Sequence, residues 1–257
     1  NAGETEPGKP DYKSFDTYVG EGGYQAWKSC VDGSKTRRDV ISTIENSALC
    51  GLGGAGFPTA KKWGFLDNAP KPRLVAINAD EGEPGTFKDR EILEHNPFQF
   101  LEGLMICAYA AQANVAYNYC RGEFWELTRV LDGKVGELRE RGLLGQKILG
   151  ADYSLDIHQH LGAGAYICGE ESALLESIEG KLGQPRIKPP FPADRGLYQQ
   201  PTVVNNTETL TNVPLIIEYG ADWYRRIGTE KSCGPKIMCL SGHAKNPGNY
   251  EVPMGLP

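Results

Sequence analysis

The sequence has no pair of cysteines at the spacing that metal centres use. Its seven cysteines are an odd number and include no C-x-x-C pair. This pattern argues against a disulfide framework and against a zinc or iron–sulfur site built from this stretch alone. Free thiols fit the reducing cytoplasm, which is the location we expect, and we expect no metal site in this stretch.

Long apolar runs are also absent. The nearest candidate, residues 101–111, is interrupted by Glu102 and Gly103, and a membrane span needs roughly 18 to 20 apolar residues. We therefore expect no direct membrane insertion. The chain does not start with Met and has no basic region followed by an apolar core. We infer neither secretion nor transit, and we expect that the first residues are missing or removed.

An excess of positive charge is the third absence. The formal net charge is −6 over 257 residues, and 40% of the residues are hydrophobic. These values give no reason to expect nucleic acid as a partner. They are typical of a globular chain that is long enough to bury a full core.

Glycine, by contrast, is concentrated at residues 51–56, where four of the six positions are glycine. Such a run suits positive φ angles and N–H groups that point toward an anion, most often a phosphate. Lys61 and Lys62 follow the loop and can add positive charge beside a phosphate. From the loop alone, a flexible turn and a phosphate cradle both remain open.

The loop matches G-x-G-x-x-G, which marks a Rossmann dinucleotide site only after a strand. Helical periodicity predicts a helix over residues 34–49, with Ser34 as its N-cap, directly before the loop. The sequence context therefore argues against a standard Rossmann fingerprint here.

Strand-like and helix-like segments alternate through the middle of the chain. Apolar runs rich in β-forming residues predict strands at residues 74–78, 115–120, 154–160 and from 202 onward. Helical periodicity predicts helices at residues 97–108, at 123–141, after Glu171, and from a capping-box-like Asn205-x-x-Glu208 to near Gly220. This alternation predicts an α/β fold, with a doubly wound parallel sheet and flanking helices.

Three parts are expected along the chain. They are an N-terminal arm at residues 1–33, with an extended stretch and a short helix; an α/β domain at 34–227; and a β-rich part at 228–257. In the last part, strand-like residues flank a turn at 246–248, which predicts a hairpin. We expect this hairpin to be the truncated start of a small β-grasp-like domain.

Polar residues follow the first and last predicted strands. In open α/β sheets, ligands bind beyond the carboxyl ends of the strands, which is where these side chains fall. The residues are Asn78, Asp80, Glu81 and Glu83 after one strand, and Asn205 and Asn206 at the other. The two asparagines are either helix caps or ligand contacts.

Glu170 and Glu171 are expected in the first turn of a helix. Negative charge there is favoured by the helix dipole, so simple helix capping is the preferred interpretation of this segment taken alone.

Four segments together resemble the family of the flavoprotein component of respiratory complex I. This family includes the NAD-reactive β subunits of NAD-dependent formate dehydrogenases and NAD-reducing hydrogenases. The segments are GLGGAGFPT at 51–59, NADEGEPGTFKDR at 78–90, GAGAYICGEE at 162–171 and PTVVNN at 201–206. The resemblance covers nearly the whole chain from about Gly22, and it implies a Rossmann-like domain that binds FMN and NAD(H).

The resemblance also implies roles for individual residues. It assigns FMN binding to Gly51, Gly53, Gly54, Lys62, Asn78, Asp80, Glu81, Gly169, Glu170, Asn205, Asn206 and Thr209. It assigns NAD(H) binding to Phe57, Phe65, Glu83, Glu171, Lys188 and Phe191. Backbone amides and a lysine suit a phosphate, and rings suit stacking on a nucleotide.

The implied activity is that of a diaphorase, an FMN-dependent NAD(H) oxidoreductase. Hydride passes directly between nicotinamide and flavin N5, so no general acid or base is assigned. Iron–sulfur protein subunits are the implied partners, and a [4Fe-4S] cluster is expected only in a missing C-terminal part. The implied location is the cytoplasm, or the cytoplasmic or matrix-side arm of a membrane complex.

The parent complex is less closely specified by the resemblance. Leu52 stands where complex I usually has Arg, so a cation near FMN is lost, and this favours a soluble formate dehydrogenase. The segments at 78–80 and 142–150 are instead similar to complex I. Formate dehydrogenase is our main expectation, and complex I is the alternative.

Two other classes of function remain open. The acids could serve a Mg²⁺-dependent phosphoryl-transfer or hydrolytic site, because magnesium prefers oxygen ligands. The chain could also be a nucleotide-binding module without turnover.

Overall fold

A parallel four-stranded sheet lies at the centre of the computed structural model, which describes residues 12–257. The strands are β1 (Leu74–Ala79), β2 (Val115–Cys120), β3 (Asp156–Leu161) and β4 (Thr202–Asn206). Their order across the sheet is β3-β2-β1-β4, and Leu74 lies opposite Val115 on one side and Thr202 on the other. The chain therefore moves outward in one direction from β1, then returns to its other side.

Helices fill most of the connections between these strands. They are α3 (Arg37–Ser47), α4 (Thr59–Gly64), α5 (Lys88–His95), α6 (Pro97–Ala111), α7 (Trp125–Glu140), α8 (Glu171–Ile178), α9 (Pro192–Arg195), α10 (Thr207–Tyr219) and α11 (Ala221–Arg225). Short 3-10 helices lie at Gly122–Phe124, Ile148–Gly150, Tyr166–Gly169 and Leu197–Gln199. The α/β fold and the alternation of strands and helices predicted from the sequence are confirmed.

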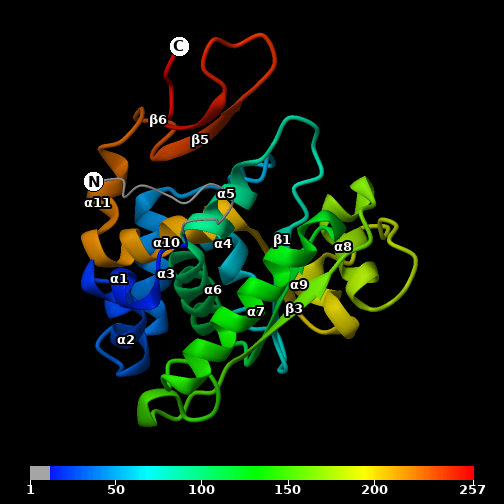
Figure 1. Cartoon of the computed structure of the whole chain (residues 1–257). Helices are drawn as coiled ribbons and strands as arrows, with labels where there is room; N and C mark the ends of the chain where they lie inside the picture. The colour runs from blue at the N-terminus through cyan, green and yellow to red at the C-terminus, as the bar shows by residue number, and fades with distance from the viewer. Residues whose placement is uncertain (1–11) are drawn as a thin grey trace.

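Both faces of the sheet are covered, because successive side chains of a strand point to opposite faces. Val75 and Ile77 of β1 belong to the larger core, which contains residues of α3, α6, α7 and α10. Leu74 and Ala76 belong to a smaller core with residues of α8. Figure 1 shows α6 and α10 on one side of β1, and α8 and α9 on the other.

The predicted C-terminal hairpin is confirmed as β5 (Pro235–Leu240) paired antiparallel with β6 (Gly248–Pro253). It lies at one end of the molecule, drawn in red in Figure 1. Glu208 at the start of α10 accepts a hydrogen bond from the Ile237 backbone N–H at 2.7 Å. The Phe87 N–H, just before α5, donates to Sγ of Cys239 at 3.2 Å. These contacts hold the hairpin against the N-terminal ends of two helices.

The N-terminal segment differs from the expected arm with one short helix. Its described part forms α1 (Phe15–Gly20) and α2 (Gln25–Val31). Residues 1–11 of the expected arm lie outside the described residues. Buried Glu102 of α6 accepts hydrogen bonds from the Tyr18 hydroxyl at 2.6 Å and from the backbone N–H groups of Tyr24 at 2.9 Å and Trp27 at 3.0 Å. This long-range contact docks the segment on the core, and no local pattern indicates it.

Two predicted helix caps are wrong by one or two residues. Thr36, and not Ser34, caps α3, in a reciprocal capping box with Asp39, because Ser34 is hydrogen-bonded to Asp32 in the preceding turn. Asn206, and not Asn205, caps α10 by accepting from the backbone N–H of Thr209.

Among the helices within residues 12–257, none combines the length and the apolar character that crossing a lipid bilayer requires.

Candidate functional site

Two adjoining cavities open at the carboxyl ends of the strands. The first has a volume of about 650 Å³ and the second about 750 Å³, and both are bounded by Gly53, Asn78, Gly169, Glu170 and Asn206. They lie where β1 and β4 are neighbours although the chain order reverses between them. Open α/β sheets bind ligands at such a switch point.

The glycine loop follows α3 and leads into α4, as the sequence predicts. A Cβ at Gly53 would lie 2.9 Å from Cβ of Asn206, so the loop approaches the end of β4 more closely than a side chain permits. Gly54 has a φ of +116°, a conformation that favours glycine. The loop therefore forms a wall of both cavities through its backbone.

Hydrogen bonds tie down the start of this loop and leave its middle open. The N–H of Gly51 donates to the carbonyl of Phe57 at 2.9 Å, and the N–H of Leu52 donates to the Thr209 hydroxyl at 2.9 Å. The N–H groups of residues 53–56 have no protein acceptor within the part of the chain that the structure describes. Unpaired amides beside a cavity are the groups that bind a phosphate.

Four charged side chains alternate in sign along one wall of the first cavity. Nζ of Lys188 lies 2.8 Å from Oε1 of Glu170 and 3.2 Å from Oε1 of Glu171. Nζ of Lys62 lies 3.7 Å from Oε2 of Glu171 and donates to the carbonyl of Val204 at 2.9 Å. Burial lowers the pKa of Lys188, but the two carboxylates outweigh burial and raise that pKa. This wall offers both cations and anions to a ligand.

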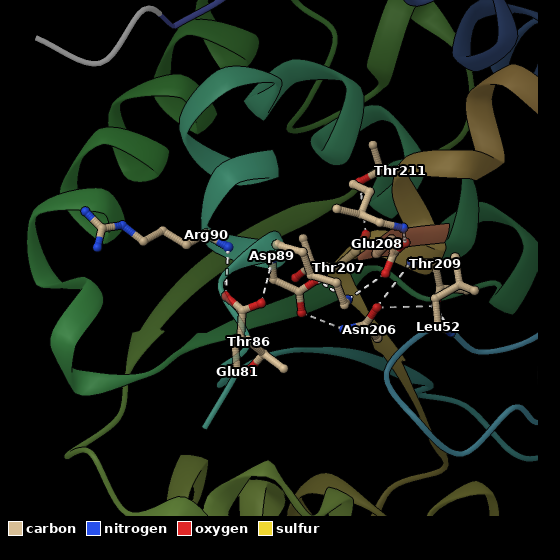
Figure 2. A network of polar contacts seen from close by, with 12 residues as sticks. Leu52, Glu81, Thr86, Asp89, Arg90, Asn206, Thr207, Glu208, Thr209 and Thr211 are labelled. Carbon is tan, nitrogen blue, oxygen red and sulfur yellow. Dashed lines mark hydrogen bonds and ion pairs between the residues drawn. The ribbon is translucent and has the colours of Figure 1, made fainter. Parts of the chain in front are cut away.

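Glu170 and Glu81 each cap a helix. Oε2 of Glu170 accepts from the N–H groups of Ser172 and Ala173, both at 2.9 Å, so the helix-capping interpretation of Glu170 is confirmed. The carboxylate of Glu81 accepts from the N–H groups of Asp89 at 2.8 Å and Arg90 at 3.0 Å, at the start of α5 (Figure 2). Their remaining ability to bind a ligand is therefore limited.

Asp80 is 2% exposed at the carboxyl end of β1. A Cβ on Gly169 would lie 3.3 Å from its Oδ2, so its carboxyl group lies directly behind a residue that lines both cavities. Burial raises the pKa of Asp80 to about 6, although Arg121 opposes the shift. The group changes charge within the physiological pH range.

Three aromatic rings stand at the first cavity. Phe57, Phe65 and Phe191 are 38%, 52% and 54% exposed, and the rings of Phe57 and Phe65 are 5.9 Å apart. Nζ of Lys61 lies 5.9 Å from the centroid of the Phe57 ring. Exposed rings that line a cavity are suited to stacking on a planar ligand.

The two predicted asparagines after β4 point in different directions. Oδ1 of Asn205 accepts from Nε1 of Trp63 at 3.3 Å and its Nδ2 faces Sγ of Cys107 at 3.4 Å, so its amide is bound to core residues. Asn206 lines both cavities. Asn78 joins two strand ends, because its Nδ2 donates to the carbonyl of Gly169 at 2.7 Å.

The structure gathers the expected flavin and nucleotide residues around the same two cavities. The first cavity is lined by Gly51, Gly53, Lys62, Asn78, Gly169, Glu170, Asn205, Asn206 and Thr209, and by Phe57, Phe65, Glu171, Lys188 and Phe191. The second is lined by Gly54, Glu81 and Glu83 in addition to shared residues. Glu83 is therefore set apart from the other expected nucleotide residues, and Asp80 lines neither cavity.

Several lining residues were not predicted. The hydroxyl of Tyr166 donates to Oε2 of Glu83 at 2.5 Å, and Tyr166 falls within the segment at 162–171 that carried the resemblance. Lys236 and Cys239 of the hairpin line the second cavity. Nζ of Lys236 lies 3.4 Å from the carbonyl of Leu52, so a cation does approach that position of the loop. No local signal could assign hairpin residues to this site.

Residues 44–215 match the protein family described as the Nuo51 FMN-binding domain. The match covers more than half of the chain and includes the glycine loop, both cavity walls from β1 and β4, and α8.

Curated relatives show the same affiliation. The chain is 51% identical over 248 residues to an F-type subunit of NADH-quinone oxidoreductase from Rhizobium meliloti, covering 96% of this chain and 59% of that protein. It is 50% identical over 246 residues to the F-type subunit of NADH-quinone oxidoreductase from Aquifex aeolicus, covering 96% of this chain and 57% of that protein. The chain thus spans less than two thirds of the length of these relatives.

A solved structure has the same fold. It is the crystal structure of an NAD+-reducing [NiFe]-hydrogenase in the air-oxidized state, with a TM-score of 0.82 and 40% identity over 98% of this chain and 43% of the other. With the family match and the identity to two NADH-quinone oxidoreductase subunits, this similarity leads to one conclusion: the chain belongs to the Nuo51 FMN-binding domain family.

Proposed function

We propose that this chain is the flavin-binding, NADH-oxidising module of a larger redox enzyme. The observation that carries the proposal is the first cavity. It combines unpaired loop amides, the Lys62 ammonium and exposed phenylalanine rings at the switch point of the sheet. These groups fit the parts of FMN and of a nicotinamide nucleotide, namely a phosphate and flat aromatic rings.

Within this proposal, each side of the cavity has its own task. The N–H groups of residues 53–56 and the Lys62 ammonium bind the flavin phosphate, while Asn78 and Asn206 offer amide groups to its polar atoms. Phe57, Phe65 and Phe191 stack on the dinucleotide, and Lys188, Glu171 and Glu83 bind its polar parts. FMN, when bound, accepts the hydride of NADH. The protein's contribution is therefore to hold the two rings in contact and to exclude water.

We propose a complex I-type assembly as the parent. The reported relatives are named as subunits of NADH-quinone oxidoreductase, which supports this alternative over the formate dehydrogenase that Leu52 favours. Leu52 contributes its N–H and carbonyl groups to the cavity wall, while its side chain is buried. Its identity is therefore a weak guide to the parent complex. The proposed partners are iron–sulfur subunits of the peripheral arm, and the proposed [4Fe-4S] acceptor lies outside this sequence.

The acids do not favour the magnesium alternative. Glu81 and Glu170 cap helices, and Glu171 pairs with two lysines. Within residues 12–257, no three His, Cys, Asp or Glu side chains are grouped so as to hold a metal ion.

The test is an absorption spectrum of the purified protein supplemented with FMN and then titrated anaerobically with NADH. We expect a bound flavin band near 450 nm, by ordinary flavin absorption, that bleaches in proportion to added NADH. Free FMN treated in the same way is the control. Binding of FMN without faster bleaching than the control would leave a nucleotide-binding module, and no binding of FMN would overturn the proposal.

A further inference from the structure

A polar network reaches the site through Asn206 (Figure 2). Oδ1 of Asn206 accepts from the N–H of Thr209 at 3.3 Å, and its Nδ2 donates to Oδ2 of Asp89 at 2.7 Å. Because an amide nitrogen carries two hydrogens, one N–H of Asn206 is left without a protein acceptor among residues 12–257. Asn206 lines both cavities, so this N–H is available to a ligand.

The two partners permit only one orientation of the Asn206 amide. The backbone of Thr209 is a donor, and the carboxylate of Asp89 is an acceptor. Exchanging the oxygen and nitrogen of the amide would set donor against donor at Thr209 and acceptor against acceptor at Asp89. Asp89 therefore determines that a donor, and not an acceptor, is offered to the cavity.

Asp89 is itself held firmly. It is 3% exposed, its Oδ1 accepts from Nζ of Lys88 at 2.8 Å, and its backbone N–H donates to Glu81. Nζ of Lys88 also lies 2.6 Å from Oε2 of Glu208. Burial lowers the pKa of Lys88, but Asp89 and Glu208 outweigh burial and raise that pKa, so the ammonium stays charged.

The glycine loop restrains Asn206 from the opposite side. The position of a Cβ on Gly53 lies 2.9 Å from Cβ of Asn206, so the side chain cannot swing toward the loop. The amide is thus confined by the loop on one side and oriented by Asp89 at its end.

We propose that Asp89 is a positioning residue, which orients the Asn206 amide so that its free N–H meets a hydrogen-bond acceptor of bound FMN. This inference rests on the proposed function, because it takes FMN as the occupant of the cavities. Both carboxylate oxygens of Asp89 are used by protein donors, one by Asn206 and one by Lys88. Asp89 therefore acts through Asn206 and not by direct contact with the ligand.

The Asp89→Asn substitution tests this orientation. Lys88 will hold the oxygen of the new amide, which turns the new NH₂ group toward Nδ2 of Asn206. Two donors then face each other, and the Asn206 amide loses its orientation. We expect the Kd for FMN, measured by flavin fluorescence quenching, to rise about tenfold through the loss of one hydrogen bond.

A double-mutant cycle with Asn206→Ala separates positioning from other effects. Asp89→Asn should change the Kd for FMN by less than about twofold when Asn206 is already alanine. An equal, roughly tenfold effect in both backgrounds would overturn the positioning role while leaving FMN binding in place. If the unaltered chain bound no FMN, the proposed function would fall, and the inference with it.

The reversed pair, Asp89→Asn with Asn206→Asp, distinguishes positioning from support of the fold. The new carboxylate at 206 accepts from both Thr209 and the new amide at 89, so thermal stability should return toward that of the unaltered chain. It offers no N–H to the cavity, so the Kd for FMN should stay raised. Recovery of both quantities would show a structural role only.

Glu102→Gln is the matched control. Glu102 is a buried carboxylate that accepts from protein donors but lines neither cavity. This variant should lower thermal stability without changing the Kd for FMN. A raised Kd here would mean that loss of stability alone weakens FMN binding, which would overturn the interpretation of Asp89→Asn.

Discussion

Single side chains at the cavity edge serve the fold and the site at once. Glu170 uses Oε2 to cap α8 and Oε1 to pair with Lys188, and Lys62 donates to the carbonyl of Val204 while its ammonium lines the first cavity. Because such residues are already held by the protein, their charges are fixed in place before a ligand arrives. This preorganisation lowers the entropy that binding must offset.

Asp80 should make the stability of the flavin-free protein depend on pH. Burial raises its pKa from 3.8 to about 6, so the folded chain binds this proton more tightly than the unfolded chain does. Its stabilising contribution is therefore full below about pH 4 and is lost as the pH rises through about 6. We expect Asp80→Asn to raise the free energy of unfolding by roughly 2 to 3 kcal/mol at neutral pH, and by almost nothing near pH 4.

Urea unfolding at both pH values measures this difference. Asp39→Asn is a control of opposite sign, because hydrogen bonds from Thr36 lower the pKa of Asp39. That variant should be less stable than the unaltered chain at neutral pH. A pH-independent effect of Asp80→Asn would contradict the raised pKa of Asp80.

Lys62→Ala should weaken FMN binding. Removing one charge-assisted contact to a phosphate costs about 1.5 to 3 kcal/mol, which corresponds to a Kd raised roughly ten- to 150-fold. Lys61→Ala is the neighbouring control, because Lys61 does not line either cavity and lies over the Phe57 ring. Fluorescence titration with FMN should therefore separate the two variants. Similar Kd values for both would remove Lys62 from the phosphate site.

At the scale of elements, α2 depends on a residue far away in the sequence. The carboxylate of Glu102 accepts from the N–H groups of Tyr24 and Trp27, at the start of α2, and from the Tyr18 hydroxyl. Glu102→Gln leaves at least one of these buried donors unsatisfied, so we expect a loss of about 2 to 3 kcal/mol in the free energy of unfolding. Denaturant unfolding measures this loss, and a loss below about 0.5 kcal/mol would show that α2 docks by apolar packing alone.

The elements that were predicted correctly are those with strong local patterns. The strand at β1 is a short apolar run between turn residues, and α6 carries an apolar face behind a proline at its first position. The helices α1 and α2 were missed because their burial depends on Glu102, 75 residues or more away along the chain. Local periodicity contains no information about such a partner.

Similar reasoning applies to the site. Residues in the four family-like segments were found because their letters identify them, and the structure brings most of them to one cavity. The cap of α10 was assigned to Asn205 because two adjacent asparagines are equivalent by pattern. Only the direction of each side chain, toward Trp63 or toward Asp89, separates them. Lys236 was missed because the hairpin was expected to belong to another domain.

At the scale of the whole molecule, the cavity walls come from segments that are distant in the sequence. They include the glycine loop, the loop after β1, the turn before α8, the end of β4 and the hairpin. A ligand that contacts several of these segments stabilises the folded chain, since the unfolded chain cannot offer them together. FMN present at 100 times its Kd should add about 2.7 kcal/mol to the free energy of unfolding.

For a chain of this size, that addition corresponds to a rise in Tm of roughly 5 to 10 °C. Riboflavin has the same ring system but no phosphate, so it cannot use the unpaired amides of residues 53–56 or the Lys62 ammonium. At the same concentration, it should raise the Tm by less than half as much. Differential scanning fluorimetry with both flavins measures the two shifts. Equal shifts would mean that the glycine loop does not bind the phosphate, because the phosphate is the only part of FMN that riboflavin lacks.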